Sequence, residues 1–133
     1  MDRIDKILNH DLFLYHLGRN NAAEADRRFC RHSMVHFLDL ARIGTIIALE
    51  EGLKINREWI YAAALLHDCG KHEQYENGIP HEQASARIAP EILKACRFND
   101  EETGVIVTAI SRHRDPEAAK EKNLNGILYR ADK

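Results

Sequence analysis

Cysteine is scarce in this sequence, and the three cysteines present form no paired pattern. They stand far apart at Cys30, Cys69 and Cys96, so no CxxC pair occurs. An odd count without a framework argues against a disulfide-stapled secreted domain, and the spacing does not fit a zinc site built from cysteines. We therefore expect a reducing, cytoplasmic location.

Long apolar runs and an excess of one charge are also missing. The N-terminal stretch MDRIDKILNHDLF is charged within its first six residues and has no apolar signal-peptide core. No window approaches the roughly 18 apolar residues of a membrane span, so we expect no membrane partner. The net charge of −2 gives no overall basic field for long nucleic acid. An anionic ligand must therefore meet local positive charge or a metal.

Helical periodicity, by contrast, runs through nearly the whole chain, and strand-like alternation is absent. We predict one all-α domain of six or seven helices over residues 1–133, with a core region of about 30–133 and an N-terminal helical extension over 1–29. Helices are expected over about 31–51, 56–70, 81–97, 99–113 and 124–132, with a short helical turn within 114–123. Gly52 should end the first of these, and Asn56 and Asn99 should cap two others.

Glycine and proline mark the expected irregularities. The segment KHEQYENGIP, from Lys71 to Pro80, contains an Asn-Gly turn dipeptide and is the longest stretch without an expected helix. The stretch from Gly18 to Asn21 is a candidate break in the N-terminal helical region. Pro90 should kink or divide its helix, because it lacks a backbone N–H.

Histidine is abundant, with eight residues, and several continue an apolar helical face. Four expected helices end such a face in an imidazole or a carboxylate, namely at His36, at His67 with Asp68, at His113 and at Asp132, while His81 opens a further helix. Inward faces converge on one core, where several titratable groups need neutralising partners. A divalent cation supplies this for all of them. Imidazole with carboxylate suits iron, manganese, zinc, nickel or cobalt better than calcium.

Each of these residues has a simpler structural explanation when taken alone. A lone histidine on an apolar face is usually a hydrogen-bonded core residue, which is the favoured interpretation of His36 by itself. A lone Asp132 would most often be solvated, and we assign His10 and His16 to the surface or the core edge. The metal is favoured by the joint occurrence, because the structural explanation must be invoked separately for every residue.

The order of these residues resembles the HD-domain superfamily of metal-dependent phosphohydrolases. HFLDLA, which begins at His36, resembles the family's HxxxVA helix, AAALLHDCGK resembles its signature block, and YRADK resembles its closing helix. IPHEQAS and ISRHR, which contain His81 and His113, resemble segments of the subset with a second metal. The resemblance covers about Cys30 to Lys133.

The resemblance implies a site with one or two divalent transition metal ions. It implies six ligands: Asp68 as the bridge, His36, His67 and Asp132 on one ion, and His81 and His113 on the other. Because relatives continue the closing helix further, we expect Asp132 to be held mainly by the metal unless more residues follow.

The same resemblance implies substrate contacts around the metal. Asp68 and Lys71 are the expected catalytic residues, and Lys71 is the leading phosphate contact because HD proteins often carry lysine there. Arg112, Arg114 and His32 are candidate substrate-binding residues. For each arginine a surface ion pair is an equally good explanation, and for His32 a structural role is.

The function implied is metal-dependent hydrolysis of a small phosphorylated metabolite, with a nucleotide favoured. Two alternatives stay open. Some HD-fold proteins with a similar pattern hold two irons and oxidise their substrates with O₂, and a catalytically silent metal-containing module that binds a ligand would keep much of the same pattern. Metal content and oxygen uptake separate the first two functions. The sequence leaves the oligomeric state open.

Overall fold

The computed structural model describes residues 1–24 and 34–132, and these form helices joined by short connections, without a strand. The elements are α1 (Asp2–Leu8), α2 (Asp11–Ala23), α3 (Met34–Glu50), α4 (Arg57–Leu66), α5 (Lys71–Asn77), α6 (His81–Ala95), α7 (Asp100–Ser111), the 3₁₀ helix η1 (Pro116–Lys120) and α8 (Leu124–Ala131). This confirms the all-α fold. The predicted site residue His32 lies outside the described residues.

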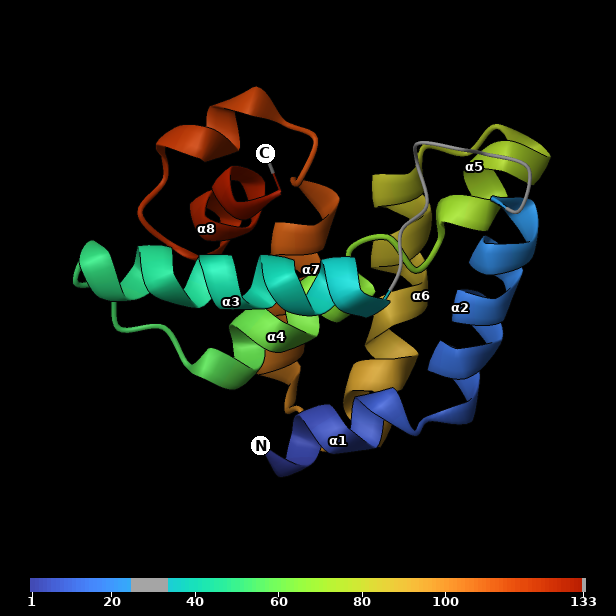
Figure 1. The fold of residues 1–133 in the computed structure, drawn as a ribbon, viewed down its shortest axis with the longest axis horizontal. Helices are drawn as coiled ribbons and strands as arrows, with labels where there is room; N and C mark the ends of the chain where they lie inside the picture. Colours follow the sequence, from blue (N-terminus) through green and yellow to red (C-terminus); the bar gives the residue numbers. More distant parts are fainter. Residues whose placement is uncertain (25–33, 133) are drawn as a thin grey trace.

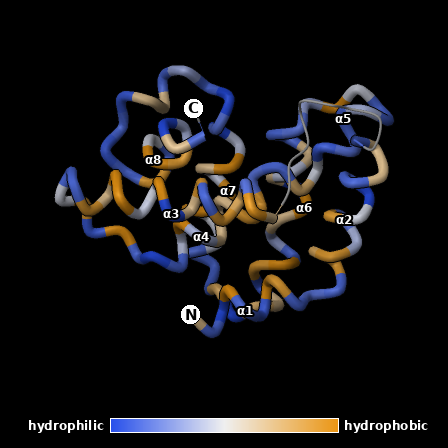
Figure 2. Tube along the Cα trace, in the orientation of Figure 1, coloured by the Kyte–Doolittle hydropathy of each residue, from blue (hydrophilic) through white to orange (hydrophobic). Residues whose placement is uncertain are grey.

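Helix α3 crosses the middle of the molecule and packs against α4 and α8 (Figure 1). Helix α4 also packs against α7, and α7 packs against α6. Helix α5 packs against both α6 and α2. Apolar residues gather along α3 and α4, whereas the connection from α7 to α8 is mostly hydrophilic (Figure 2). The largest fully buried apolar side chains are Ile7, Phe13, Phe37, Leu65, Leu66, Ile92, Leu93, Ile106, Ile110, Ile127 and Leu128. None of the described helices is long and apolar enough to cross a bilayer.

The predicted helix ends are confirmed where the sequence carries capping residues. The Asn56 side chain accepts a hydrogen bond from the Glu58 backbone N–H at 2.8 Å. Asn99 and Glu102 form a complete capping box at the start of α7. Gly52 has φ of 68°, a conformation that favours glycine, and it follows the end of α3. Each of these signals is made by residues close together in the sequence, which explains why the sequence sufficed to predict them.

Two expected irregularities are wrong, and the expected division of a helix at Pro90 does not occur. The segment expected to be irregular begins with α5, which ends at Gly78 in the left-handed conformation. The break in the N-terminal region lies between α1 and α2, where His10 caps α2 by accepting from the Leu12 N–H at 3.1 Å, and Gly18 lies inside α2. Pro90 lies within an undivided α6, where burial of neighbours such as Ile92 offsets the missing backbone hydrogen bond.

The buried face of α3 also differs from the predicted one. In the sequence, Leu40, Ile43 and Ile47 follow His36 at helical spacing, which predicts one inward stripe. Leu40 is buried, but Ile43 is 46% exposed. The buried face instead carries small residues, with Ala41, Gly44 and Ala48 inside. A Cβ added at Gly44 would lie 3.1 Å from side chains of both α4 and α8. Close packing of three helices therefore selects the small residues, and His36 is left at the rim.

Candidate metal centre

The core of the site is the end of α4, where the helix stops at His67. His67 is fully buried, and its Nδ1 lies 2.6 Å from the carbonyl oxygen of Ala64. A carbonyl only accepts hydrogen bonds, so Nδ1 carries the donated proton. The other nitrogen, Nε2, is buried without a well-aligned hydrogen-bond partner among the described residues, although Asp68 Oδ2 is 3.2 Å away. A buried nitrogen in this position is suited to a cation.

Two further histidines present the same nitrogen to the same place. His113, just beyond the end of α7, has Nδ1 2.7 Å from the carbonyl oxygen of Ile110. His81, the first residue of α6, has Nδ1 2.7 Å from the amide oxygen of Gln74. In the neutral ring, each Nδ1 therefore donates and each Nε2 keeps its lone pair.

The three Nε2 atoms surround the Asp68 carboxylate. Asp68 Oδ1 lies 3.4 Å from His81 Nε2 and 3.5 Å from His113 Nε2, while Oδ2 faces His67. His81 Nε2 and His113 Nε2 are only 3.1 Å apart. Two lone pairs at that distance repel, so a proton or a cation is needed beside them. The two oxygens of one buried carboxylate thus point toward different imidazoles.

Helices α3 and α8 complete the cluster on its outer side. The carboxylate of Asp132, the residue that ends α8, lies 3.5 Å from His67 Nε2. His36 Nε2 is 4.0 Å from the same Asp132 oxygen, and 44% of the His36 side chain is exposed. The structure therefore brings all six predicted metal ligands together, with His36 and Asp132 at the solvent edge and the others buried.

The pKa shifts in the cluster show that its carboxylates favour a positive charge beside them. Burial disfavours an imidazolium at His67, but Asp68 and Asp132 outweigh it and raise the His67 pKa to about 10. Burial would likewise raise the pKa of Asp68, yet His67 and His113 hold it well below its usual value. Burial lowers the pKa of His81 to about 4. The nearby Asp68 carboxylate opposes this shift, and the positive charge of Lys71 adds to it. In the metal-free protein, the proton on His67 therefore supplies the positive charge that a bound metal cation would otherwise supply.

The donor geometry fits a metal in two overlapping groups. Nitrogen and oxygen atoms of His36, His67 and Asp132 lie within 4.8 Å of one another, and so do those of His67, Asp68 and His113. These imidazole and carboxylate donors suit a first-row transition metal. No cysteine of residues 1–24 and 34–132 takes part, so these residues form no closed structural zinc site of the cysteine-rich type.

The predicted phosphate contacts differ in their exposure and in their charged neighbours. Lys71 begins α5 directly after the His67-Asp68 turn, and its charge reaches His81, whose pKa it helps to lower. The guanidinium of Arg112 instead forms ion pairs with Asp115 and Glu121. Arg114 is exposed. Lys71 is therefore the predicted contact with the clearest electrostatic link to the cluster.

The residues that hold the turn after His67 in place carry no recognisable signal in the sequence. The amide of buried Asn20, on α2, donates to the Asp68 carbonyl oxygen at 3.0 Å and accepts from the His72 N–H at 2.8 Å. From the other side, Ser85 Oγ accepts from the Gly70 N–H at 2.8 Å. No local pattern marks Asn20, because its partners lie about fifty residues away.

A pair of histidines lies beside this turn, with His16 at the core edge as expected and His72 buried. His16 Nδ1 and His72 Nε2 are 2.8 Å apart, joining α2 to α5. Burial lowers the pKa of both residues. Because the segment from Lys71 to Asn77 was expected to be irregular, no pattern predicted that His72 would be buried.

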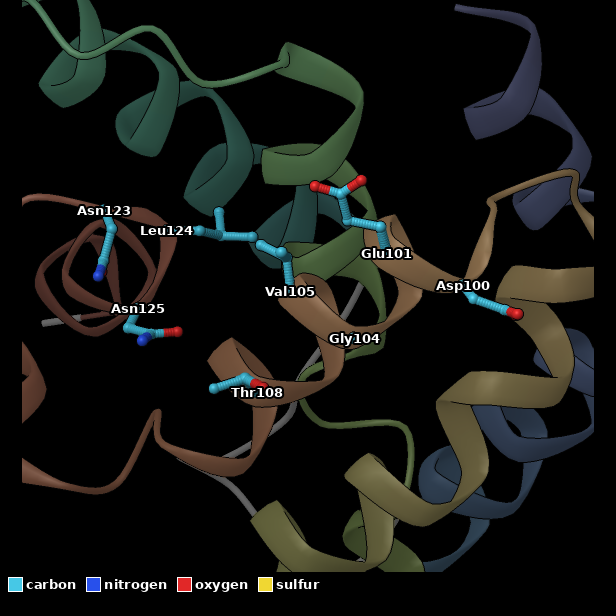
Figure 3. Close-up of a pocket in the computed structure, with 8 residues that line it drawn as sticks. All are labelled: Asp100, Glu101, Gly104, Val105, Thr108, Asn123, Leu124 and Asn125. Atoms are coloured by element: carbon cyan, nitrogen blue, oxygen red, sulfur yellow. The ribbon is translucent and has the colours of Figure 1, made fainter.

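A surface pocket lies between α7 and the start of α8 (Figure 3). Its lining residues are Asp100, Glu101, Gly104, Val105, Thr108, Asn123, Leu124 and Asn125. They include two carboxylates and none of the predicted metal ligands. A phosphate would be repelled there, so the pocket does not compete with the His/Asp cluster as a phosphate site.

The fold and the cluster define the class of this protein. The family model of the HD domain matches residues 34–133, which is most of the chain. The chain therefore belongs to the HD-domain family, and the resemblance seen in the sequence is confirmed.

Two individual relatives add to this. An uncharacterized protein of Clostridium beijerinckii is 50% identical over 133 residues, covering 100% of this chain and 83% of that protein. The crystal structure of a predicted HD superfamily hydrolase from an uncultured Thermotogales bacterium is similar, with a TM-score of 0.67 and 24% identity. That similarity covers 90% of this chain and 65% of the other, and at this identity it shows the fold alone.

Proposed function

We propose that this protein is a metal-dependent phosphohydrolase acting on a small phosphorylated metabolite, with a nucleotide as the favoured substrate class. The observation that carries the proposal is the convergence of buried imidazole Nε2 atoms on the Asp68 carboxylate, each opposite an Nδ1 already fixed by a hydrogen bond. Membership of the HD-domain family supports it, as does the description of the Thermotogales protein as a predicted hydrolase.

Asp68 is suited to bridge two ions, because its two oxygens face different imidazoles. In this arrangement His36, His67 and Asp132 would hold one ion, and His81 and His113 would hold the other. His67 also lies within reach of the Asp68 and His113 donors, so the two sets overlap. The donor chemistry fits iron, manganese, zinc, nickel or cobalt.

The reaction adds water across a phosphoryl bond. The water oxygen bonds to phosphorus, the bond from phosphorus to the leaving oxygen breaks, and that oxygen takes up a proton. A bound divalent ion supplies Lewis acidity and a lowered pKa for a coordinated water. The chain's own contribution is to orient the carboxylates and imidazoles and to place the Lys71 ammonium where it neutralises the phosphate.

A phosphate-release screen tests this proposal. The purified protein is stripped with a chelator, reloaded separately with Mn²⁺, Fe²⁺, Co²⁺, Ni²⁺ or Zn²⁺, and assayed over nucleotides and sugar phosphates. We expect metal-dependent release of phosphate that disappears after renewed chelation. The proposal is wrong if a fully loaded protein releases no phosphate from any of these substrates.

The same screen separates the alternative functions. Oxygen uptake with the iron-loaded protein, without phosphate release, would identify an oxygenase. Tight binding of a phosphorylated ligand without turnover under any metal would identify a silent binding module. Turnover with a redox-inert ion such as Zn²⁺ favours hydrolysis over oxidation.

A further inference from the structure

His81 differs from the other buried histidines of the cluster in its place on a helix. His67 and His113 stand at the ends of α4 and α7, and each donates from Nδ1 to a carbonyl three residues earlier in the chain. Carbonyls of the last helical turn lack helical partners, so they are available for this bond. His81 is the first residue of α6, and no carbonyl of that helix precedes it. Its ring needs an acceptor from elsewhere.

Gln74 of α5 provides that acceptor. A single atom of its side-chain amide lies 2.9 Å from the His81 backbone nitrogen and 2.7 Å from His81 Nδ1. The backbone N–H can only donate, so the atom that faces it is the amide oxygen. The same oxygen can only accept from Nδ1, which must therefore carry the proton. Two hydrogen bonds thus fix both the start of α6 and the orientation of the ring.

Without Gln74, His81 has a competing arrangement. Asp68 Oδ1 lies 3.4 Å from Nε2 and would accept from a ring protonated at Nε2. Such a ring has no lone pair facing the cluster and cannot bind a metal there. The other candidate acceptor for Nδ1, the Glu82 carboxylate, is 3.9 Å away, beyond hydrogen-bond distance.

We propose that Gln74 is a positioning residue that holds His81 as the Nδ1–H tautomer and thereby makes Nε2 available as a metal ligand. The tautomer part stands on the hydrogen bonds alone, whereas the metal part rests on the proposed function. Gln74 does not touch the substrate or the metal in this role, and its effect passes through the imidazole.

The test compares Gln74→Met with a matched variant of the chain's only other glutamine. Gln83, on α6, is exposed, so Gln83→Met is the control. Gln74→Glu keeps an acceptor for Nδ1 and should therefore keep the wild-type tautomer of His81. The double variant Gln74→Met with Glu82→Gln removes the carboxylate that could move in as a substitute. Circular dichroism confirms the fold of each variant.

Two readouts are measured. In the metal-free proteins, ¹⁵N NMR at pH 8 reports which nitrogen of His81 is protonated. We expect Nδ1–H in the wild type, Gln83→Met and Gln74→Glu, and mainly Nε2–H in Gln74→Met and the double variant. Titration with Co²⁺, followed by its absorption spectrum, should give affinity about 10- to 100-fold weaker in Gln74→Met than in Gln83→Met.

The outcomes distinguish the two proposals. If His81 has the same tautomer in the wild type and in both Gln74→Met variants, the positioning role is overturned. If all proteins bind Co²⁺ equally tightly, the positioning role is again overturned while the proposed function stands. If no protein binds Co²⁺, the proposed function fails, and the NMR comparison alone still decides whether Gln74 sets the tautomer.

Discussion

When no metal is bound, the stability contributed by individual side chains of the cluster depends on which of them carry a proton. Asp68 and Asp132 raise the His67 pKa to about 10, whereas burial lowers the His81 pKa to about 4. The ordinary value for both is 6.5. The two histidines therefore affect stability in opposite directions as the pH changes.

We expect the metal-free protein to be most stable near pH 6.5. Because the His67 pKa is raised in the folded state, its contribution is complete below pH 6.5 and is lost as the pH rises toward about 10. Because the His81 pKa is depressed, its contribution is present above pH 6.5 and is lost as the pH falls toward about 4. Urea denaturation in chelator from pH 4 to pH 10 measures both limbs.

His81→Gln provides the control for this profile. It should remove much of the acid limb and leave the alkaline limb, which belongs to His67. A free energy of unfolding that rises steadily above pH 6.5 would show that His67 is not held protonated between the two carboxylates.

Lys71 should act on the substrate rather than on the metal. Lys71→Met is expected to keep bound metal at the wild-type level while lowering kcat/KM for phosphate release by about 10- to 100-fold, the effect of losing one charge-assisted hydrogen bond. Metal analysis and steady-state kinetics check the two parts. Lys54→Met, at an exposed position before α4, is the matched control. Loss of metal in Lys71→Met would contradict the assigned role.

The residues of the cluster lie at or next to the ends of helices rather than in their middles. The end of α4 must lie close to α6, and Gly70 allows this approach. A Cβ at Gly70 would lie 2.7 Å from the backbone of both Ala84 and Ser85. Backbone atoms cannot rotate away as a side chain can, so a larger residue would force the two elements apart.

Gly70→Ala should therefore destabilise the fold by about 1–3 kcal/mol or more through overpacking, and it should weaken metal binding by displacing His81. Gly18→Ala is the comparison, because nothing lies within 4 Å of a Cβ at that position inside α2. It should stabilise the protein by up to about 1 kcal/mol through helix propensity. Denaturant unfolding measures both variants. Equal stability of the two would contradict the close approach of α4 and α6.

The molecule as a whole shows which features local sequence determines. The caps at Asn56 and Asn99 follow from residues two or three positions apart. The proposed metal ligands could be predicted because polar groups end apolar helical faces. The buried face of α3 did not follow, because Gly44 faces side chains of two other helices. The role of Gln74 could not be predicted, because α5 buries only His72 and therefore shows no apolar stripe. Contacts between distant segments decided these cases.

Metal stoichiometry of the wild type and of Asp68→Asn tests most directly whether the six side chains hold ions around one shared carboxylate. Each protein is reloaded with Mn²⁺ or Co²⁺, freed of excess ion and analysed by mass spectrometry of the elements. Asp39→Asn, an exposed change on α3, is the control. We predict two ions per chain in the wild type and the control, and a loss of affinity greater than about 100-fold in Asp68→Asn, since losing a bridging ligand should exceed the effect of losing a supporting residue. A folded Asp68→Asn that retains both ions, or a wild type that binds none, would contradict the proposed centre.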